Sequence, residues 1–130
     1  MAELILVIES DPVIRGEYRS TIGDLGCRML ACDHPEIALH LVESARPDLV
    51  IVDMHPAGTS GTDLVRDIKA RYPDLPVLIC AECRCYEEDF GSWAADACIS
   101  RSAGLDLLER ELRRRLALAE PVQEAPRRAQ

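Results

Sequence analysis

The sequence predicts an α/β fold, namely a doubly wound sheet of five parallel strands in the order 2-1-3-4-5 with helices on both faces. Short aliphatic runs alternate with segments whose apolar residues recur at helical spacing, which is typical of βαβ units. Two of the runs, 4–8 and 49–52, are almost wholly aliphatic, as expected of strands that are buried on both faces of a parallel sheet. Every connection reads as a helical crossover, and such crossovers join parallel neighbours.

The first strand and the first helix are the best marked elements. Residues 4–8 form an unbroken aliphatic run. Asp11 followed by Pro12 predicts a helix start, because aspartate favours the N-cap and proline favours the first helical position. Apolar residues then recur at helical spacing over 13–25, and Gly26 is expected to end the helix.

The middle of the chain repeats this pattern of strand and helix. A weaker strand is expected over 27–32, followed by a helix with one apolar face over 37–45 that Pro47 terminates. Residues 49–52 form the most aliphatic strand of the chain. Asp53 stands at the end of this strand.

The second half of the chain contains two further strands. A helix over 64–72 leads through a Pro-Asp-Leu-Pro turn into a strand over 77–80. A helix within 86–93 is only weakly marked. A short strand over 97–100 precedes a helix over 105–116 that carries its leucines on one stripe.

Length and charge limit the class of protein. The 130 residues can bury one core, so we expect one domain over 1–119 and a flexible C-terminal tail over 120–130. A net charge of -8 argues against nucleic-acid binding. The chain shows no secretory signal and no apolar run near the roughly 20 residues of a membrane span, so we expect a cytoplasmic protein without membrane contact.

The predicted topology gathers polar residues at one edge of the sheet. Ligands bind beside the carboxyl ends of the strands in a doubly wound sheet. The residues that follow the strands there are Glu9, Ser10, Asp11, Asp53, 80–82 and Arg101. Clustered carboxylates favour a hard cation such as Mg²⁺, and a carboxylate beside such a cation can attack phosphorus. The alternative is that Glu9 and Asp11 only cap a helix, while Asp53 is a turn residue.

Four segments resemble, in order and spacing, the receiver domain of two-component response regulators. They read LILVIESDPVIR at 4–15, PDLVIVDMHP at 47–56, LPVLI at 75–79 and ADACISRS at 95–102. The resemblance covers about residues 3 to 118 and implies the flavodoxin-like receiver fold. It also implies a signalling module rather than an enzyme, with a sensor histidine kinase or phosphotransfer protein and a downstream protein as partners.

The resemblance implies that Asp53 accepts a phosphoryl group from a phosphohistidine, with Mg²⁺ neutralising the oxygens in transfer. Glu9 would hold or position the Mg²⁺, and the backbone carbonyl of His55 would be a further ligand. Ser10 stands where the family has a second metal-ligating acid, and a neutral hydroxyl is a poor replacement for a carboxylate. We therefore expect Mg²⁺ binding by Glu9, Ser10, Asp53 and His55 to be weak or absent.

Two further positions depart from the family pattern. Ungapped alignment puts Ala81 at the position of the switch hydroxyl, and a shift of one residue puts Cys80 there. Neither side chain supplies a good hydroxyl donor for the usual switch. Arg101 replaces the lysine that pairs with the acyl phosphate, and its guanidinium can form a bidentate pair with Asp53 without any metal.

Three functional interpretations therefore stay open. The first is a phosphoacceptor with weakened metal affinity, and the second is a pseudo-receiver that binds its partner without phosphorylation, which the departures from the pattern favour. In both, we expect a stand-alone receiver that acts through protein contacts. The third is a metal or redox sensor built on Cys80, Cys83 and Cys85. Without a secretory signal, all six cysteines are expected to be reduced.

Overall fold

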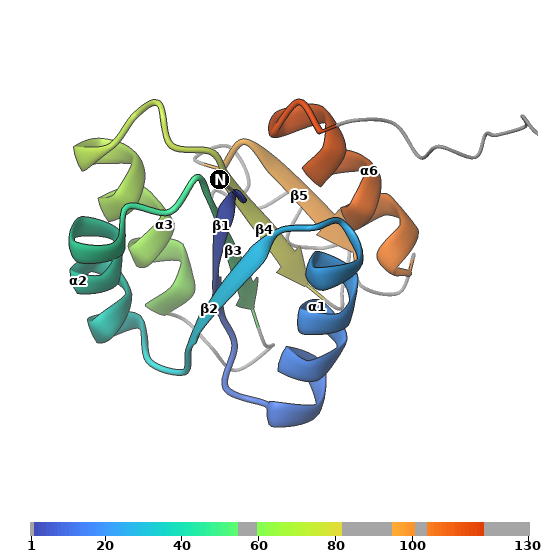
Figure 1. Cartoon of the computed structure of the whole chain (residues 1–130). Helices are drawn as coiled ribbons and strands as arrows, with labels where there is room; N and C mark the ends of the chain where they lie inside the picture. The colour runs from blue at the N-terminus through green and yellow to red at the C-terminus, as the bar shows by residue number, and fades with distance from the viewer. Residues whose placement is uncertain (1, 55–59, 82–94, 101–103, 119–130) are drawn as a thin grey trace, which may run out of the picture.

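The computed structural model describes residues 2–54, 60–81, 95–100 and 104–118, in which five strands form one sheet in the order β2-β1-β3-β4-β5 (Figure 1). The elements are β1 (Leu4–Ile8), α1 (Pro12–Asp24), β2 (Arg28–Cys32), α2 (Pro35–Ala45), β3 (Leu49–Met54), α3 (Ser60–Arg71), β4 (Val77–Ala81), β5 (Ala97–Ser100) and α6 (Leu105–Arg115). Each pair of neighbouring strands is parallel. The predicted fold class and strand order are confirmed.

The helices cover the sheet in two layers. Figure 1 shows α2 and α3 on one face and α1 and α6 on the other. Side chains alternate between the faces of a strand, so Leu6 and Ile8 of β1 pack with α2 and α3, whereas Ile5 and Val7 pack with α1 and α6. The odd-numbered residues of β3 also belong to the α1 layer. This alternation places position 53 on the side of the sheet that α1 covers.

Both ends of α1 form as predicted. Asp11 is the N-cap, with its Oδ1 accepting a hydrogen bond from the backbone N–H of Val13 at 2.8 Å, and Pro12 occupies the first turn. Gly26 follows the helix with a φ of 80°, in the left-handed region that favours glycine. These two local signals fix where α1 leaves β1 and where the chain turns into β2.

Several bounds and faces differ from the prediction. β2 begins at Arg28 rather than at residue 27, while β3 and β4 run on to Met54 and Ala81 because these two residues still pair in register. Val13 and Ile37, which open the apolar patterns of α1 and α2, are 70% and 44% exposed. Each lies in the first turn of its helix.

A hydrogen-bonded cluster closes the amino edge of β4 and β5. The Nζ of Lys69 donates to the carbonyls of Pro73 and Leu75 and to Oδ2 of Asp96, at 3.0, 2.8 and 2.9 Å. Oδ2 of Asp96 also accepts from the backbone N–H of Val77 at 2.7 Å. Asp96 directly precedes β5, so the cluster fixes the starts of both strands against α3.

Some predicted features lie outside the described residues. These are the helix expected within 86–93, the end of the domain at 119 and the tail over 120–130. Within the part of the chain that the structure describes, none of the helices has the length and apolar character needed to cross a membrane.

Candidate functional site

The neighbouring strands β1 and β3 each carry an acid at their carboxyl ends. Ile8 pairs with Val52 in parallel register, so Glu9 and Asp53 are the residues that follow this pair in the two segments. Both acids are buried, with 1% of Glu9 and 7% of Asp53 exposed. The structure therefore brings together at one edge the two acids that the sequence predicts there.

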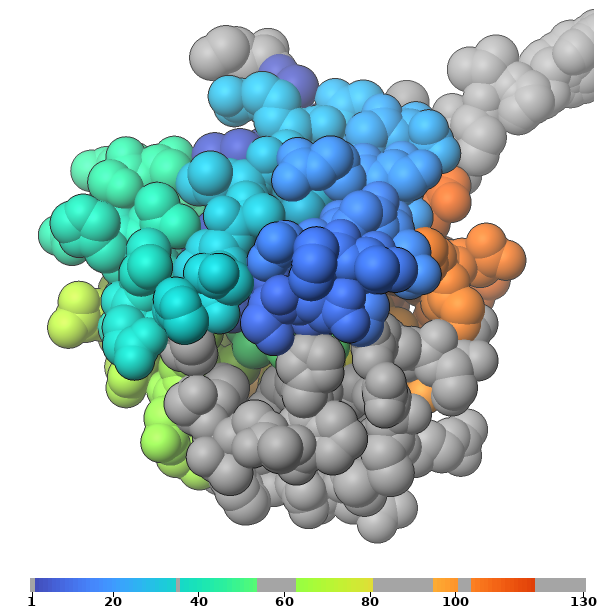
Figure 2. Space-filling model, turned by 90° about the horizontal axis from the view of Figure 1, so that it is seen from below, coloured from blue at the N-terminus to red at the C-terminus, as the bar shows by residue number. Residues whose placement is uncertain are grey.

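Figure 2 shows this edge from outside the molecule. The beginning of α1 lies in the middle of the described surface, with α2 on one side and α6 on the other. Ser10 is exposed and directly precedes the N-cap of this helix. The first turn of α1 is thus the described element that stands beside the acidic edge.

Glu9 is held by the chain around it. Its Oε2 accepts from the backbone N–H of Asp11 at 2.7 Å, and its own N–H donates to the carbonyl of Cys32 at 2.9 Å. Its carbonyl accepts from Nη1 of Arg15 at 2.9 Å. Glu9 therefore orders the turn between β1 and α1 as the capping alternative predicts, and it still lies at the site edge. Asp11 serves as the helix cap.

The Asp53 carboxylate accepts a hydrogen bond that the sequence analysis does not anticipate. The hydroxyl of Tyr18, on α1, donates to Oδ2 of Asp53. Tyr18 is 1% exposed and packs in the layer between the sheet and α1. Burial raises the pKa of this hydroxyl far above its ordinary value, and the neighbouring Cys80 and Asp53 raise it further. The hydroxyl therefore stays protonated and acts as a donor.

Cys80 completes a buried group of three side chains. It is the register partner of Asp53 on β4, and it packs in the same layer as Tyr18. It lies close enough to the tyrosine hydroxyl to contribute to the raised pKa of that group. We refer to Tyr18, Asp53 and Cys80 as the tyrosine cluster.

Of the remaining predicted site residues, the structure describes only some. Ala81 is the last residue of β4, where its backbone pairs with Met54 and Ser100. Four predicted residues lie outside the described ranges, namely His55, Cys83, Cys85 and Arg101. The expected pairing of Arg101 with Asp53 therefore also lies outside them.

Glu9 and Asp53 offer oxygen ligands of the kind that Mg²⁺ accepts. One oxygen of each is already hydrogen-bonded, Oε2 of Glu9 to the backbone of Asp11 and Oδ2 of Asp53 to Tyr18. Ser10 adds no charge. Within the described ranges, no group of three or more His, Cys, Asp or Glu side chains could hold a metal ion. Glu9 and Asp53 therefore offer a divalent cation two carboxylates, which are fewer anionic ligands than a dication favours.

The described cysteines are free thiols, and they are Cys27, Cys32, Cys80 and Cys98. Burial is the largest cause that raises the pKa of Cys27 and of Cys32. For Cys32, a backbone hydrogen bond at His34 acts in the opposite direction without reversing the shift. Thiols with a raised pKa are poor nucleophiles and metal ligands at neutral pH. Cys27 and Cys32 therefore behave as small buried hydrophobic residues.

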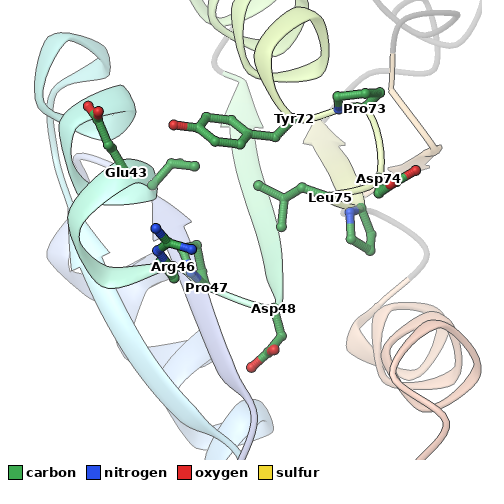
Figure 3. Close-up of a pocket in the computed structure, with 10 residues that line it drawn as sticks. Glu43, Arg46, Pro47, Asp48, Tyr72, Pro73, Asp74 and Leu75 are labelled. Carbon is green, nitrogen blue, oxygen red and sulfur yellow. The ribbon is translucent and has the colours of Figure 1, made fainter.

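A hollow lies at the opposite edge of the sheet (Figure 3). Its volume is about 590 Å³, and it is formed by the turns that lead into β3 and β4. Figure 3 shows Glu43 and Arg46 on one side of it and Tyr72 on the other. Arg46 caps α2 in the left-handed conformation, with a φ of 54°. Because the hollow borders the amino ends of these strands, it is separate from Asp53 at the carboxyl edge.

Tyr18 is the site residue that pattern analysis misses. In the sequence it reads as one of the apolar-face residues that recur along α1. The available signal is chemical, since a buried tyrosine hydroxyl almost always has a hydrogen-bond partner. Helical spacing does not reveal which residue that partner is.

The five-stranded parallel sheet, with buried acids at the carboxyl ends of β1 and β3, is the arrangement expected of a receiver-type α/β module. The family model for the response regulator receiver domain matches residues 5–87, which is more than half of the chain. The chain belongs to the response regulator receiver domain family. Domains of this family are phosphorylation targets of histidine kinases in two-component signalling, and they are in general signalling modules rather than enzymes.

Curated relatives of the chain are response regulators. The two-component response regulator PhoP from Pseudomonas aeruginosa is 31% identical over 75 residues, which are 58% of this chain and 33% of PhoP. The response regulator MprA from Mycobacterium ulcerans is 30% identical over 107 residues, which are 82% of this chain and 40% of MprA. The chain thus spans well under half the length of these relatives.

Solved structures support the same assignment. The response regulator TrrA from Thermotoga maritima, in complex with Mg²⁺-BeF, matches with a TM-score of 0.81 and 27% identity over 87% of this chain and 98% of TrrA. TrrA in complex with the histidine kinase ThkA matches with a TM-score of 0.79 and 28% identity over 88% of this chain and 98% of TrrA. The receiver fold of the chain is therefore confirmed.

Proposed function

We propose that this chain is a receiver that accepts a phosphoryl group on Asp53 from a histidine kinase or a phosphotransfer protein, with weakened affinity for Mg²⁺. The observation that carries the proposal is the placement of Glu9 and Asp53 directly after one register pair of β1 and β3. A buried carboxylate is costly unless it is paired or hydrogen-bonded. An acid at this position, where an apolar residue would continue the core, therefore supports a chemical role.

The proposed reaction moves a phosphoryl group from a histidine nitrogen of the partner to a carboxylate oxygen of Asp53. An oxygen of Asp53 forms a bond to phosphorus while the bond from phosphorus to the partner's histidine nitrogen breaks. Mg²⁺, when bound, supplies positive charge that neutralises the transferring oxygens. Glu9 and Asp53 would hold it, with the hydroxyl of Ser10 and the carbonyl of His55 as further ligands. Arg101 would pair with the phosphoryl oxygens.

Intact-mass measurement after incubation with a small acyl phosphate donor and Mg²⁺ tests the proposal. Wild-type protein is expected to gain the mass of one phosphoryl group, and Asp53→Asn is expected to gain none. The matched control is Asp63→Asn, which alters an exposed aspartate of α3 and should label like the wild type. A wild-type chain that stays unlabelled at saturating donor and Mg²⁺ would overturn the phosphoacceptor assignment.

A second function is a pseudo-receiver that docks its partner without phosphorylation. One observation favours it, namely that the Tyr18 hydroxyl already engages Oδ2 of Asp53. In that case neither wild type nor Asp53→Asn is labelled, and both bind the same partner equally well. In either case we infer an output through contacts with a downstream protein. This output would not use the usual switch hydroxyl, because Ala81 has none.

A further inference from the structure

The hydroxyl of Tyr18 stands between two partners on neighbouring strands. It donates to Oδ2 of Asp53 on β3. Cys80, the register partner of Asp53 on β4, packs in the same layer and lies close enough to raise the pKa of the hydroxyl. Tyr18, Asp53 and Cys80 are 1%, 7% and 2% exposed. A phenol in this place can turn from the Asp53 carboxylate toward the neighbouring sulfur without first reaching water.

The hydrogen bond changes what the Asp53 carboxylate can do. A donor on Oδ2 withdraws charge from the carboxylate, and it occupies a lone-pair direction that a cation or a phosphorus atom would need. In the buried layer below α1, where the local dielectric is low, such a bond is stronger than it would be in water. Tyr18 therefore stabilises the Asp53 anion without help from a bound cation.

We propose that Tyr18 is a positioning residue that holds Asp53 in a resting state, and that its hydroxyl competes with a divalent cation for Oδ2. Binding of the cation, or attack of this oxygen on phosphorus, then requires the hydroxyl to turn from Asp53 toward the sulfur of Cys80. The inference rests on the proposed function, because it assigns a restraint to the same acceptor carboxylate. The restraint comes from α1, the helix whose first turn lies at the acidic edge (Figure 2).

Cys80 makes the release of Asp53 less costly. A buried hydroxyl that loses its acceptor is destabilised, and a thiol sulfur, although a weak acceptor, offers a replacement inside the same layer. Cys80→Ala removes that replacement. It should therefore strengthen the hold of Tyr18 on Asp53 and weaken Mg²⁺ binding, which is the opposite of the effect expected for removal of the tyrosine hydroxyl.

Calorimetric titration with Mg²⁺ tests the competition directly. Tyr18→Phe keeps the ring and removes the hydroxyl, so it is expected to bind Mg²⁺ about tenfold more tightly than the wild type, because hydrogen bonds to charged groups are among the strongest in proteins. The matched control is Tyr72→Phe, which removes a tyrosine hydroxyl at the opposite edge and should leave the affinity unchanged. An affinity of Tyr18→Phe that equals or falls below that of the wild type overturns the inference.

A purely structural role of Tyr18 predicts a different result. It would lower the thermal midpoint of Tyr18→Phe and leave Mg²⁺ affinity unchanged or reduced. If Tyr18→Phe does not fold, wild-type protein with ¹³C-labelled tyrosine provides the second measurement. Saturating Mg²⁺ should shift the ring-carbon resonance of Tyr18 and leave that of Tyr72 in place. A Tyr18 resonance that does not respond to bound Mg²⁺ contradicts the inference.

Labelling with the acyl phosphate donor separates this inference from the proposed function. If both are correct, Tyr18→Phe is labelled faster than the wild type. If Mg²⁺ affinity rises in Tyr18→Phe and neither protein is labelled, the restraint stands and the phosphoacceptor function fails. If the wild type is labelled and Tyr18→Phe binds Mg²⁺ no more tightly, the phosphoacceptor function stands and the restraint fails.

Discussion

The ammonium of Lys69 lies 2.9 Å from Oδ2 of Asp96, and this ion pair joins α3 to the residue that precedes β5. The two side chains are 19% and 29% exposed, and the same carboxylate oxygen accepts from the backbone of Val77. A pair that is sheltered in this way and shares its acceptor with a backbone group contributes more to stability than an exposed surface pair.

Replacement of Lys69 with methionine is expected to lower the free energy of unfolding by about 1 to 2 kcal/mol, since the ion pair and two hydrogen bonds to carbonyls are lost together. Urea denaturation followed by circular dichroism measures the change. Arg66→Met is the matched control, because Arg66 pairs with Asp63 at 3.2 Å while the side chains are 42% and 75% exposed. Equal losses in the two variants would contradict the special role of Lys69.

Glu111 is expected to make stability depend on acid pH. Its burial alone raises the pKa of the carboxyl, but hydrogen bonds from Arg115 and Arg114 outweigh burial and hold the pKa below its usual value. A carboxyl whose pKa is depressed by folding stabilises the protein above its unfolded pKa, and this contribution disappears as the pH falls through the folded pKa.

Glu111→Gln should therefore be less stable than the wild type by about 1 kcal/mol at neutral pH, with the difference shrinking once the pH falls below about 4. Urea denaturation at a series of pH values measures this window. Glu17→Gln, which alters an exposed carboxyl on α1, serves as the control and should differ little from the wild type throughout. A difference for Glu111→Gln that persists undiminished in acid would refute the role of ionisation.

The position where α1 ends can be tested by replacing each of two glycines, Gly23 and Gly26, with alanine. Gly26→Ala is expected to destabilise the protein by about 1 kcal/mol, because the φ of 80° there strains any residue with a Cβ. Gly23→Ala lies inside α1, and beyond the local helix backbone no atom lies within 4 Å of the added Cβ, so a gain of about 0.5 to 1 kcal/mol is expected. The measurement is the thermal midpoint of unfolding of both variants. Changes of the same sign in the two midpoints would contradict the assigned end of α1.

Ser10→Asp is expected to strengthen Mg²⁺ binding about tenfold or more, because it adds a charged oxygen ligand beside Glu9 and Asp53. Ser10→Asn is the matched control, since it has nearly the same shape as the aspartate and no charge. Calorimetry compares the three proteins. Labelling by the phosphodonor should rise in Ser10→Asp. It should be absent from the double variant that carries both Ser10→Asp and Asp53→Asn. A wild-type affinity equal to that of Ser10→Asp would rule out a weakened site.

Most of the fold could be predicted because strands that are buried on both faces of a sheet appear in the sequence as continuous apolar runs. The bounds of β1 and β5 agree with their apolar runs, and the Asp11-Pro12 pair fixes the start of α1. β3 extends beyond its aliphatic run because strand pairing depends on the neighbour and not on apolarity, so Asp53 can remain in the sheet. Val13 and Ile37 fit the helical period but face solvent, because the period does not show where the sheet ends beneath a helix.

The candidate site could be predicted in part for the same reason. Parallel topology alone places Glu9 and Asp53 at one edge. The contact of Tyr18 with Asp53 could not be predicted, because it depends on the rotation of α1 over the sheet and on the rotamer of one side chain. A sequence pattern reports which helix face is buried, and it does not report which atom lies opposite a particular hydroxyl.

Asp96 is bonded to helices from both layers. Its carboxylate accepts from Lys69 of α3, and its backbone carbonyl accepts from Nη2 of Arg115 of α6 at 2.9 Å. Because α3 and α6 cover opposite faces of the sheet (Figure 1), a single residue fastens the two outer layers at the amino edge. The bond from Arg115 holds the last residue of α6 at the amino edge. Because the 11 residues of α6 begin at Leu105, the helix links the amino edge to the region that follows β5.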